Sequence, residues 1–242
     1  MDALARTIRQ RYLRTLDRIA AAAQAVGRDP QSVRLVVVTK AQPLAVVRAA
    51  VAAGIRTLGE NYPEEAVEKI LAVGMGTGVE WHMIGHVQSR KACLVAEHFA
   101  LLHSLDSLKL AARLDRFAAQ VERILPVLLE FNLGGEESKF GWPAWDESRW
   151  QDLLPQVAEV LRCSHLEVSG LMAMPPLPEH AAEESRPYFQ RLRCLRDFLT
   201  KHFPPASWQE LSMGTSADFA VAVQEGATLV RVGQAILGTR PA

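Results

Sequence analysis

One lysine of this sequence stands where it could bond covalently to a carbonyl compound. Lys40 follows the apolar run Val36-Val37-Val38-Thr39, so we expect it at the end of a buried strand. From there a flexible stem can reach a central ligand, and partial burial lowers the pKa of the ammonium. These conditions suit a lysine that forms a Schiff base with an aldehyde. A strand-end lysine that extends its amine into solvent is the other interpretation, and position alone leaves both open.

The scarcity of lysine narrows the candidates for such chemistry. Only six of the 27 basic residues are lysines, and arginine does not form imines. Lys109 follows Asp106-Ser107 inside a predicted helix, where we expect a solvated surface residue. Lys40 alone stands directly at a strand end.

A second group of residues has the composition of a phosphate site. The segment Ser212-Met213-Gly214-Thr215-Ser216-Ala217-Asp218 marks the turn into a predicted helix, and Gly233 opens a short helical segment after the last predicted strand. Backbone N–H groups at two helix starts, with the Thr215 and Ser216 hydroxyls, could bind a phosphate dianion. Alternatively, Ser216 is only a helix cap and Gly233 only a turn glycine.

Arg231 lies beside this predicted phosphate site, at the end of the last strand. A guanidinium can donate a hydrogen bond to a neutral heteroaromatic nitrogen but opposes its protonation. If the ligand is a pyridine aldehyde phosphate, this leaves the ring a weaker electron sink. A salt-bridged or phosphate-binding arginine is the alternative.

Other residues carry weaker signals. His82 and His86 have the spacing of metal ligands on a helix, but His82 lies in a predicted strand and no carboxylate cluster accompanies the pair, so we expect no metal site. The three cysteines show no C-x-x-C spacing, and we expect free, buried thiols. Met172, Met174 and Met213 are more typical of core packing, although strand-end methionines could lie against a flat ring.

The elements that must position these residues alternate as βα units. This alternation predicts a single (β/α)₈ barrel with an extra N-terminal helix, and an open doubly wound sheet is the alternative. No composition break or linker divides the chain, so we expect one domain over residues 1–242. The predicted strands cover residues 35–38, 57–59, 81–85, 100–103, 126–132, 167–172, 210–212 and 228–231. The predicted helices cover residues 3–26, 43–53, 63–73, 88–97, 107–122, 147–162, 180–202 and 216–225, with Ser107, Asp146 and Ser216 as caps.

The carboxyl ends of barrel strands form the active face of this fold. Lys40, Asn61, the segment 212–218 and Arg231 all follow or end predicted strands, so we expect them at one mouth of the barrel.

Composition limits the partners. The chain has 242 residues, with 27 acidic and 27 basic side chains, and a zero net charge argues against nucleic acid as the main partner. No signal peptide or apolar span of membrane length is present, which predicts a cytoplasmic protein without a membrane partner. The neutral surface is compatible with a monomer or a weak dimer.

Taken together, the motifs resemble those of the pyridoxal phosphate homeostasis proteins, the YggS/PROSC-like family, whose barrel is similar to the N-terminal domain of alanine racemases. The matching segments are Val36–Lys40, Gly59–Tyr62, Trp81–Ser89, His103–Ser107, Gly135–Lys139, Gly170–Met174, Leu211–Phe219 and Val230–Gly233. Their order and joint coverage of nearly the whole chain make the resemblance specific.

The resemblance implies that Lys40 holds pyridoxal 5′-phosphate (PLP) as a Schiff base. It further implies that Thr215, Ser216 and Gly233 bind the phosphate and that Arg231 approaches the pyridine nitrogen. The remaining residues that it implies around the cofactor are Asn61 and Met172, lining the ring, with Ser212 and Met213.

Three departures from the family pattern concern the rim of this site. Arg90 stands where the family usually has asparagine, Glu130-Phe131 replaces a Gln-Val type pair, and Thr215 replaces a frequent methionine.

The resemblance favours a carrier that buffers PLP or delivers it to PLP-dependent apoenzymes, without catalysis of its own. The alternative is a PLP-dependent amino-acid racemase with weak activity. Racemisation needs acid/base groups on both faces of the ring. In alanine racemases, one of these groups is a tyrosine of a second domain, and we expect this chain to have no residues left to form such a domain. Tyr12, Tyr62 and Tyr188 fall in predicted helices or at their starts. A Schiff-base aldolase acting on a phosphorylated sugar is a third hypothesis.

Overall fold

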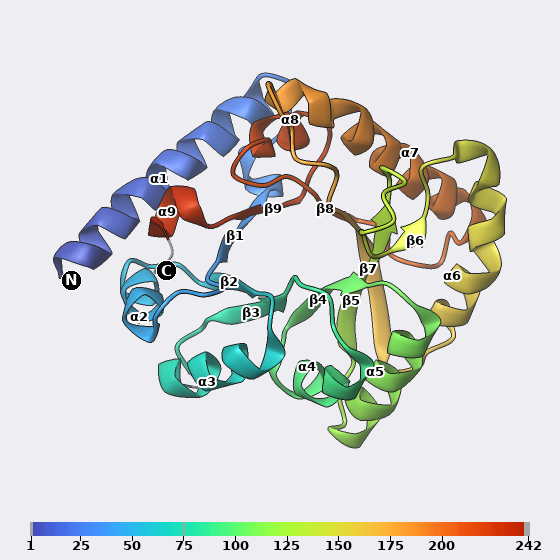
Figure 1. Ribbon diagram of the computed structural model, residues 1–242, viewed down its shortest axis with the longest axis horizontal. Helices are drawn as coiled ribbons and strands as arrows, with labels where there is room; N and C mark the ends of the chain where they lie inside the picture. The colour runs from blue at the N-terminus through green and yellow to red at the C-terminus, as the bar shows by residue number, and fades with distance from the viewer. Residues whose placement is uncertain (1, 75, 240–242) are drawn as a thin grey trace.

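Eight parallel strands close into a barrel in the computed structural model, which describes residues 2–74 and 76–239. Figure 1 looks into this barrel and shows the helices arranged around the strands. The barrel strands are β1 (Arg34–Val38), β2 (Thr57–Glu60), β3 (Glu80–Met83), β4 (Leu101–Leu105), β5 (Leu125–Asn132), β7 (Leu166–Ala173), β8 (Glu210–Ser212) and β9 (Leu229–Val232). Because β4 pairs with β5, the two ends of the strand order meet and an open sheet is excluded.

The predicted barrel with its N-terminal helix is therefore confirmed. The helices are α1 (Ala3–Gln24), α2 (Leu44–Ala52), α3 (Pro63–Val73), α4 (Ala92–His98), α5 (Leu108–Gln120), α6 (Leu154–Leu161), α7 (Arg186–His202), α8 (Phe219–Gln224) and α9 (Gln234–Leu237). Short 3-10 turns η1 (Pro30–Ser32), η2 (Ser89–Lys91), η3 (Glu147–Leu153) and η4 (Ala182–Ser185) precede β1, α4, α6 and α7. Three predicted helices consequently begin as 3-10 turns before they become α-helical.

Two local predictions need correction. The sequence pattern did not predict β6 (Trp142–Pro143), a two-residue strand that pairs with the end of β5. The helix predicted from Ser216 begins only at Phe219, because the Asp218 carboxylate accepts hydrogen bonds from the Thr215 backbone and hydroxyl and closes a separate turn first. The predicted caps Ser107 and Asp146 are confirmed.

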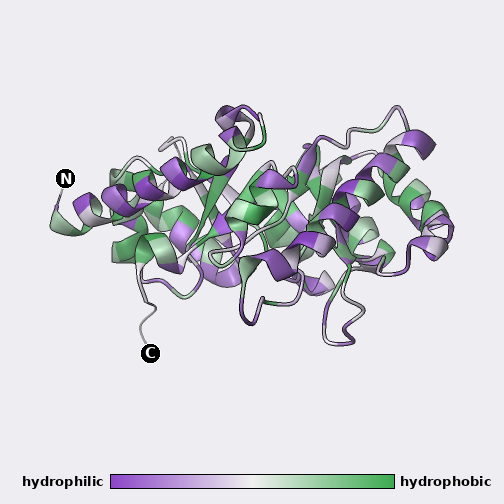
Figure 2. Cartoon of the chain, turned by 90° about the horizontal axis from the view of Figure 1, so that it is seen from above, coloured by the Kyte–Doolittle hydropathy of each residue, from purple (hydrophilic) through white to green (hydrophobic). Residues whose placement is uncertain are grey.

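The alternation of side chains along the strands creates two apolar regions. A large core lies between the strands and the helices, and a small separate cluster lies inside the barrel. In Figure 2 the strands and the inward sides of the helices are mostly hydrophobic, and hydrophilic residues lie mainly on the outer sides of the helices. The inner cluster consists of Val36, Leu101, Leu128, Met172 and Leu229, one residue from each of five strands.

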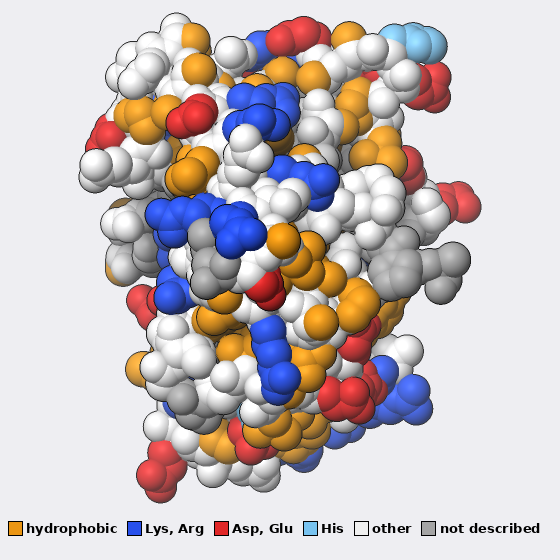
Figure 3. Space-filling model, turned by 90° about the vertical axis from the view of Figure 1, so that its left-hand side faces the viewer, with side chains coloured by type: hydrophobic (Ala, Val, Ile, Leu, Met, Phe, Trp, Pro, Cys, Tyr) orange, Lys and Arg blue, Asp and Glu red, His pale blue; other side chains and the backbone are white. Residues whose placement is uncertain are grey.

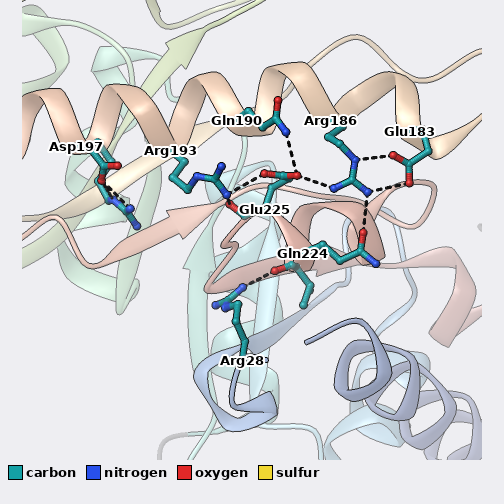
Figure 4. Close-up of polar contacts among 10 residues, drawn as sticks. Arg28, Glu183, Arg186, Gln190, Arg193, Asp197, Gln224 and Glu225 are labelled. Carbon is teal, nitrogen blue, oxygen red and sulfur yellow. Dashed lines mark hydrogen bonds and ion pairs between the residues drawn. The ribbon is translucent and has the colours of Figure 1, made fainter. Parts of the chain in front are cut away.

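A polar network fastens the carboxyl end of α8 to α7 (Figure 4). Glu225, which follows α8, accepts hydrogen bonds or ion pairs from Arg186 at 2.6 Å and from Arg193 at 2.9 Å. Arg28, after α1, donates to the carbonyls of Val223 and Ala227. These contacts hold α8, and with it the turn that precedes it, against the barrel.

The surface is mixed in charge, as the neutral composition predicts, but the cysteine thiols are less buried than expected. Basic, acidic and apolar side chains are interspersed on the side of the molecule where α1, α2 and α9 lie (Figure 3). All three cysteines are free, but the expectation that they are buried is wrong: Cys194 on α7 is exposed, and Cys93 on α4 and Cys163 after α6 are partly buried, because none of them lies in a barrel strand. Among residues 2–74 and 76–239, no helix is long and apolar enough to cross a membrane.

Candidate functional site

The mouth at the carboxyl ends of the strands contains two adjoining cavities. The first, which we call the lysine cavity, has a volume of about 380 Å³. It is lined by Val38, Lys40, Asn61, Ile84, Met174, Leu177, Thr215, Ser216, Ala217, Arg231, Gly233 and Gln234. Residues that are far apart in the sequence, Lys40 and Arg231 among them, thus share one cavity of the size of a small-molecule site.

The turn that carries Lys40 is held from below by a buried lysine. Lys69 on α3, which is 6% exposed, donates to the Thr39 carbonyl at 3.0 Å and to Glu60 at 2.8 Å. Glu65 accepts a hydrogen bond from the Ala41 backbone, where φ is +56°. Positive φ is costly for alanine, so these contacts stabilise a strained turn that positions Lys40 at the cavity.

Glu60 completes this support. It is fully buried and also accepts a hydrogen bond from the Thr39 hydroxyl at 2.7 Å. Burial raises the pKa of Glu60, while the hydrogen bonds from Lys69 and Thr39 oppose the shift. The sequence alone did not identify Glu60 or Lys69 as part of the site, because their positions at the end of β2 and inside α3 gave no sign that they meet.

Arg231 is held inside the barrel by acceptors on two neighbouring strands. Its guanidinium donates to the carbonyl of Ala173 at 3.0 Å and to both the carbonyl and the hydroxyl of Ser212. Burial lowers the pKa of Arg231 to about 10, so the side chain remains a cation at neutral pH and can only donate hydrogen bonds.

A chain of hydrogen bonds continues from Ser212 through the barrel interior. The Ser212 hydroxyl lies 2.8 Å from His103 Nδ1, and His103 Nε2 lies 3.0 Å from His82 Nδ1. The Ser212 hydroxyl also accepts a hydrogen bond from Arg231, so the guanidinium and the two rings belong to one connected network. Burial lowers the pKa of His82 to about 3 and that of His103 well below its ordinary value, so both rings are neutral. His82 is therefore part of a structural network.

The turn before α8 presents the predicted phosphate-binding groups. Asp218 accepts from the Thr215 N–H at 2.7 Å and from the Ser185 hydroxyl at 2.8 Å, which fixes the turn. Gly214 has φ of +91°, and a Cβ there would lie 2.6 Å from the Cβ of Ala222. Only glycine suits this position. The adjoining helices α8 and α9 contain six and four residues, so anion binding here depends on nearby N–H and O–H groups more than on a long helix dipole.

Asn61 occupies the wall between the cavities. It follows β2, and a Cβ at Gly85 would lie 2.6 Å from its carbonyl oxygen, so glycine at position 85 permits the close approach of the two strands. The Asn61 side-chain oxygen is buried and has no hydrogen-bond partner. A ligand donor at this point would satisfy it.

Six of the nine predicted cofactor-binding residues line the lysine cavity, namely Lys40, Asn61, Thr215, Ser216, Arg231 and Gly233. The other three lie behind its wall. Met172 is 1% exposed in the inner apolar cluster, Met213 is fully buried in the outer core, and Ser212 supports Arg231. Met174, two residues after Met172 on the same side of the chain, lines the cavity in its place.

The second cavity, which we call the glutamate cavity, has a volume of about 390 Å³ and shares Asn61, Ile84 and Met174 with the first. Its other lining residues are Tyr62, Pro63, Gly85, His86, Gln88, Lys91, Glu130, Ser138, Lys139 and Phe140. In the sequence, Glu130 is the one charged residue of the otherwise apolar run 127–131, a signal that could have predicted a buried carboxyl at this site. Tyr62, which is 58% exposed, brings a tyrosine to the edge of the site.

The histidine pair considered for metal binding is separated by the fold. His82 lies inside the barrel, whereas His86 lies at the mouth, 2.7 Å from Asp106 and stacked on Phe140. Within the part of the chain that the structure describes, no group of three or more His, Cys, Asp or Glu side chains could hold a metal ion. The chemistry of the mouth is thus that of a lysine, a guanidinium, hydroxyls and buried carboxyls.

Comparison with known proteins places this arrangement in a family. Residues 15–241 match the model of the alanine racemase N-terminal domain. The pyridoxal phosphate homeostasis protein of Pseudomonas aeruginosa is 42% identical over 236 residues, which are 97% of this chain and 96% of the relative. The protein of the same name from Escherichia coli K12 is 38% identical, covering 93% of each chain.

Solved structures agree. PipY from Synechococcus elongatus, determined with PLP bound, has a TM-score of 0.77 and 36% identity, covering 92% of this chain and 99% of PipY. An alanine racemase from Streptomyces coelicolor has a TM-score of 0.71 at 17% identity, covering 96% of this chain and 58% of the racemase, and shows the shared barrel alone. This chain belongs to the pyridoxal phosphate homeostasis protein family.

Proposed function

We propose that this protein binds PLP in the lysine cavity and acts as a carrier that buffers the cofactor or delivers it to PLP-dependent apoenzymes. The observation that carries the proposal is the presence of Lys40, Arg231 and the Thr215-Ser216 turn around one cavity. An amine, a ring-nitrogen donor and an anion-binding turn are the three groups that an aldehyde, a pyridine and a phosphate require.

Each of these groups would contact a different part of the cofactor. Lys40 would hold the cofactor covalently, and the backbone N–H and hydroxyl of Ser216, with Gly233, would bind its phosphate. Thr215 donates its N–H and its hydroxyl proton to Asp218, so it would shape the turn that presents Ser216. Arg231 would donate to the ring nitrogen, and Asn61 would contact the ring. The buried, unpartnered oxygen of Asn61 is a group that a bound ligand would satisfy. When bound, PLP supplies an aldehyde carbon that forms a reversible Schiff base with an amine.

Met172, Ser212 and Met213 take indirect roles in this proposal. Ser212 orients Arg231, and the two methionines fill the core behind the ring. We assign the contact with the ring to Met174 instead, because it lines the cavity.

Arg231 favours a carrier over a catalyst. Its guanidinium keeps its proton, with a pKa of about 10, and this opposes protonation of the ring nitrogen and so weakens the electron withdrawal that amino-acid chemistry on PLP uses. The carrier function therefore needs only reversible exchange at Lys40.

We propose that the carrier operates within a single domain and in the cytoplasm, a reducing compartment that suits three free cysteines.

The experiment that tests the site is the replacement of Lys40. The purified protein should show the visible absorption band of a lysine-bound cofactor, and borohydride reduction should add a phosphopyridoxyl mass to Lys40. Both signals should disappear in Lys40→Ala and persist in Lys109→Ala, a control lysine that is exposed on α5. A band of unchanged intensity in Lys40→Ala would refute the assignment.

The racemase alternative is favoured by one observation, the position of Tyr62 at the edge of the glutamate cavity. Rapid α-deuterium exchange of an amino acid in D₂O that requires both Lys40 and Tyr62 would establish it. An aldolase acting through the same lysine would instead leave the purified protein colourless.

A further inference from the structure

Glu130 is a buried carboxyl without a hydrogen-bonding partner on one of its oxygens. It lies on the inner side of β5, 9% exposed, and its Oε2 atom accepts no hydrogen bond. A buried oxygen without a hydrogen-bond donor lowers the stability of the folded state. Glu130 lines a cavity, where a bound ligand would supply the missing donor.

Two unsatisfied acceptor oxygens belong to residues that line the glutamate cavity. Asn61 Oδ1, which is also buried and unpartnered, lines the glutamate cavity together with Glu130. An ammonium group carries three N–H donors and no acceptor, and it is the ligand group that complements two such oxygens.

Two lysines also line this cavity and are less buried than Glu130: the Lys91 and Lys139 side chains are 26% and 28% exposed, against 9% for Glu130. Lys139 donates to the carbonyls of Met174 and Pro175 at 3.3 Å and lies 3.7 Å from Glu136, while Lys91 pairs with Glu64. The cavity thus has carboxyl and amide oxygens at its inner wall and ammonium groups farther out. This polarity matches an α-amino acid whose ammonium enters first.

We propose that the glutamate cavity binds an α-amino acid and that Glu130 accepts a proton from its ammonium group. The inference rests on the proposed function, since the shared wall of Asn61, Ile84 and Met174 would bring the amine to a cofactor held on Lys40. It gives the carrier a way to release its cargo to small amines.

The exchange is balanced in protons and bonds. One N–H bond of the ammonium breaks and an O–H bond forms on Glu130, which leaves a lone pair on the amine. That lone pair bonds to the carbon that a C=N double bond joins to Lys40. Both bonds of this double bond break as a new C=N double bond forms to the incoming nitrogen, and the two remaining protons of the amine pass to Nζ, which leaves as a neutral amine. Glu130 then returns its proton to Lys40, so the carboxylate is regenerated.

The surroundings of Glu130 suit a base at neutral pH. Burial raises the pKa of Glu130 to about 7, Asp106 raises it as well, and Arg231 and Lys139 oppose the shift. The other titratable side chains that line its cavity are Tyr62, His86 and Lys91. His86 is paired with Asp106. Since a base acts best when its pKa lies near the working pH, exchange should accelerate as the pH rises through about 7.

The kinetic test compares wild type with Glu130→Gln, which keeps the shape and removes the titration. Each protein is loaded with PLP and mixed with glycine, and the fraction still attached to Lys40 is followed by borohydride trapping and mass analysis. We expect exchange at pH 8 to slow at least ~10-fold in Glu130→Gln, with the acceleration around neutral pH lost. Glu137→Gln, which changes an exposed carboxylate in the loop after β5, is the matched control. Equal rates and equal pH profiles in wild type and Glu130→Gln would overturn the proposal.

A second readout does not depend on the cofactor. In PLP-free protein with ¹³C-labelled glutamate carboxyls, the Glu130 signal, assigned by its absence in Glu130→Gln, should titrate near pH 7. Glycine should lower that midpoint, because an ammonium stabilises the carboxylate, whereas acetate should not. A midpoint that glycine does not move would contradict the inference. Failure of the protein to load PLP would instead refute the proposed function, and this titration would still decide the role of Glu130.

Discussion

At the scale of single residues, the site depends on polar side chains that are buried at a cost and held by specific partners. Arg231 has acceptors on β7 and β8, and the turn at Lys40 is supported by Lys69 and Glu65. Glu130 has one oxygen without a partner, as Glu60 does, but Glu60 is also paired with Lys69 and Thr39, and burial raises the pKa of Glu130 to about 7. Glu130 is therefore the residue at which pH should affect stability most directly.

The ionisation of Glu130 should destabilise the fold as the pH rises. In the folded state its pKa is raised from 4.5 to about 7, so the folded protein binds more protons than the unfolded chain between these values. Stability from this group is complete below about pH 4.5 and is lost as the pH passes 7, at a cost of at most ~3 kcal/mol.

Urea denaturation of wild type and Glu130→Gln between pH 5 and pH 8 measures this effect, to the order of ~1–3 kcal/mol. The variant should gain stability relative to wild type as the pH increases. A constant difference between the two proteins across this range would show that the carboxyl titrates normally.

At the scale of elements, the anion-binding turn is positioned by contacts at both ends of α8. Asp218 holds the turn to Ser185 at the amino end, and Glu225 joins the carboxyl end to Arg186 and Arg193 on α7. A helix of six residues has little stability of its own. Its placement must therefore come from these tertiary contacts.

Removing Glu225 should loosen α8 and the turn before it. The Glu225 side chain is 8% exposed and pairs with two arginines that are 29% and 39% exposed, so we expect Glu225→Ala to cost about 1–3 kcal/mol. We also expect weaker PLP binding, which fluorescence or absorbance titration would measure. Glu183→Ala is the control, because its 64% exposed side chain pairs with the same Arg186 and should contribute less than ~1 kcal/mol. Equal losses in the two variants would refute this role of Glu225.

At the scale of the whole molecule, closure of the barrel makes the interior a shared core. The inner cluster takes residues from β1, β4, β5, β7 and β9, so it connects strands from both halves of the chain. It lies directly beneath the polar groups of the mouth, since Met172 is near the end of β7 and Met174, just past that end, lines the lysine cavity.

Truncation in this cluster should weaken the entire barrel. Leu128 is fully buried, and Leu128→Ala should lower the free energy of unfolding by about 2–5 kcal/mol. Circular dichroism and tryptophan fluorescence should report one shared, earlier transition. Leu71→Ala, at a leucine that is 65% exposed, should change stability by less than ~0.5 kcal/mol. Separate transitions in the Leu128 variant would show that the two halves unfold independently.

The sequence by itself determined the order of strands and helices, the barrel fold and most of the polar side chains that lie at the mouth of the barrel. This was possible because strand alternation and capping residues are local signals, and because the carboxyl ends of parallel strands must share one face. Lys40, Asn61, Thr215, Ser216, Arg231 and Gly233 were predicted in this way and line one cavity.

Only the tertiary structure decided which side chains reach that cavity and what supports them. Met172 and Met174 are two residues apart, so their side chains lie on the same side of the chain. The depth of each inside the barrel depends on the register between the strands, and it leaves Met172 buried while Met174 lines the cavity. The hydrogen bonds that join His82, His103 and Ser212 connect three strands, and the burial that raises the pKa of Glu130 comes from the packing around it. Such contacts link residues with no fixed spacing in the sequence, so no local pattern could have predicted them.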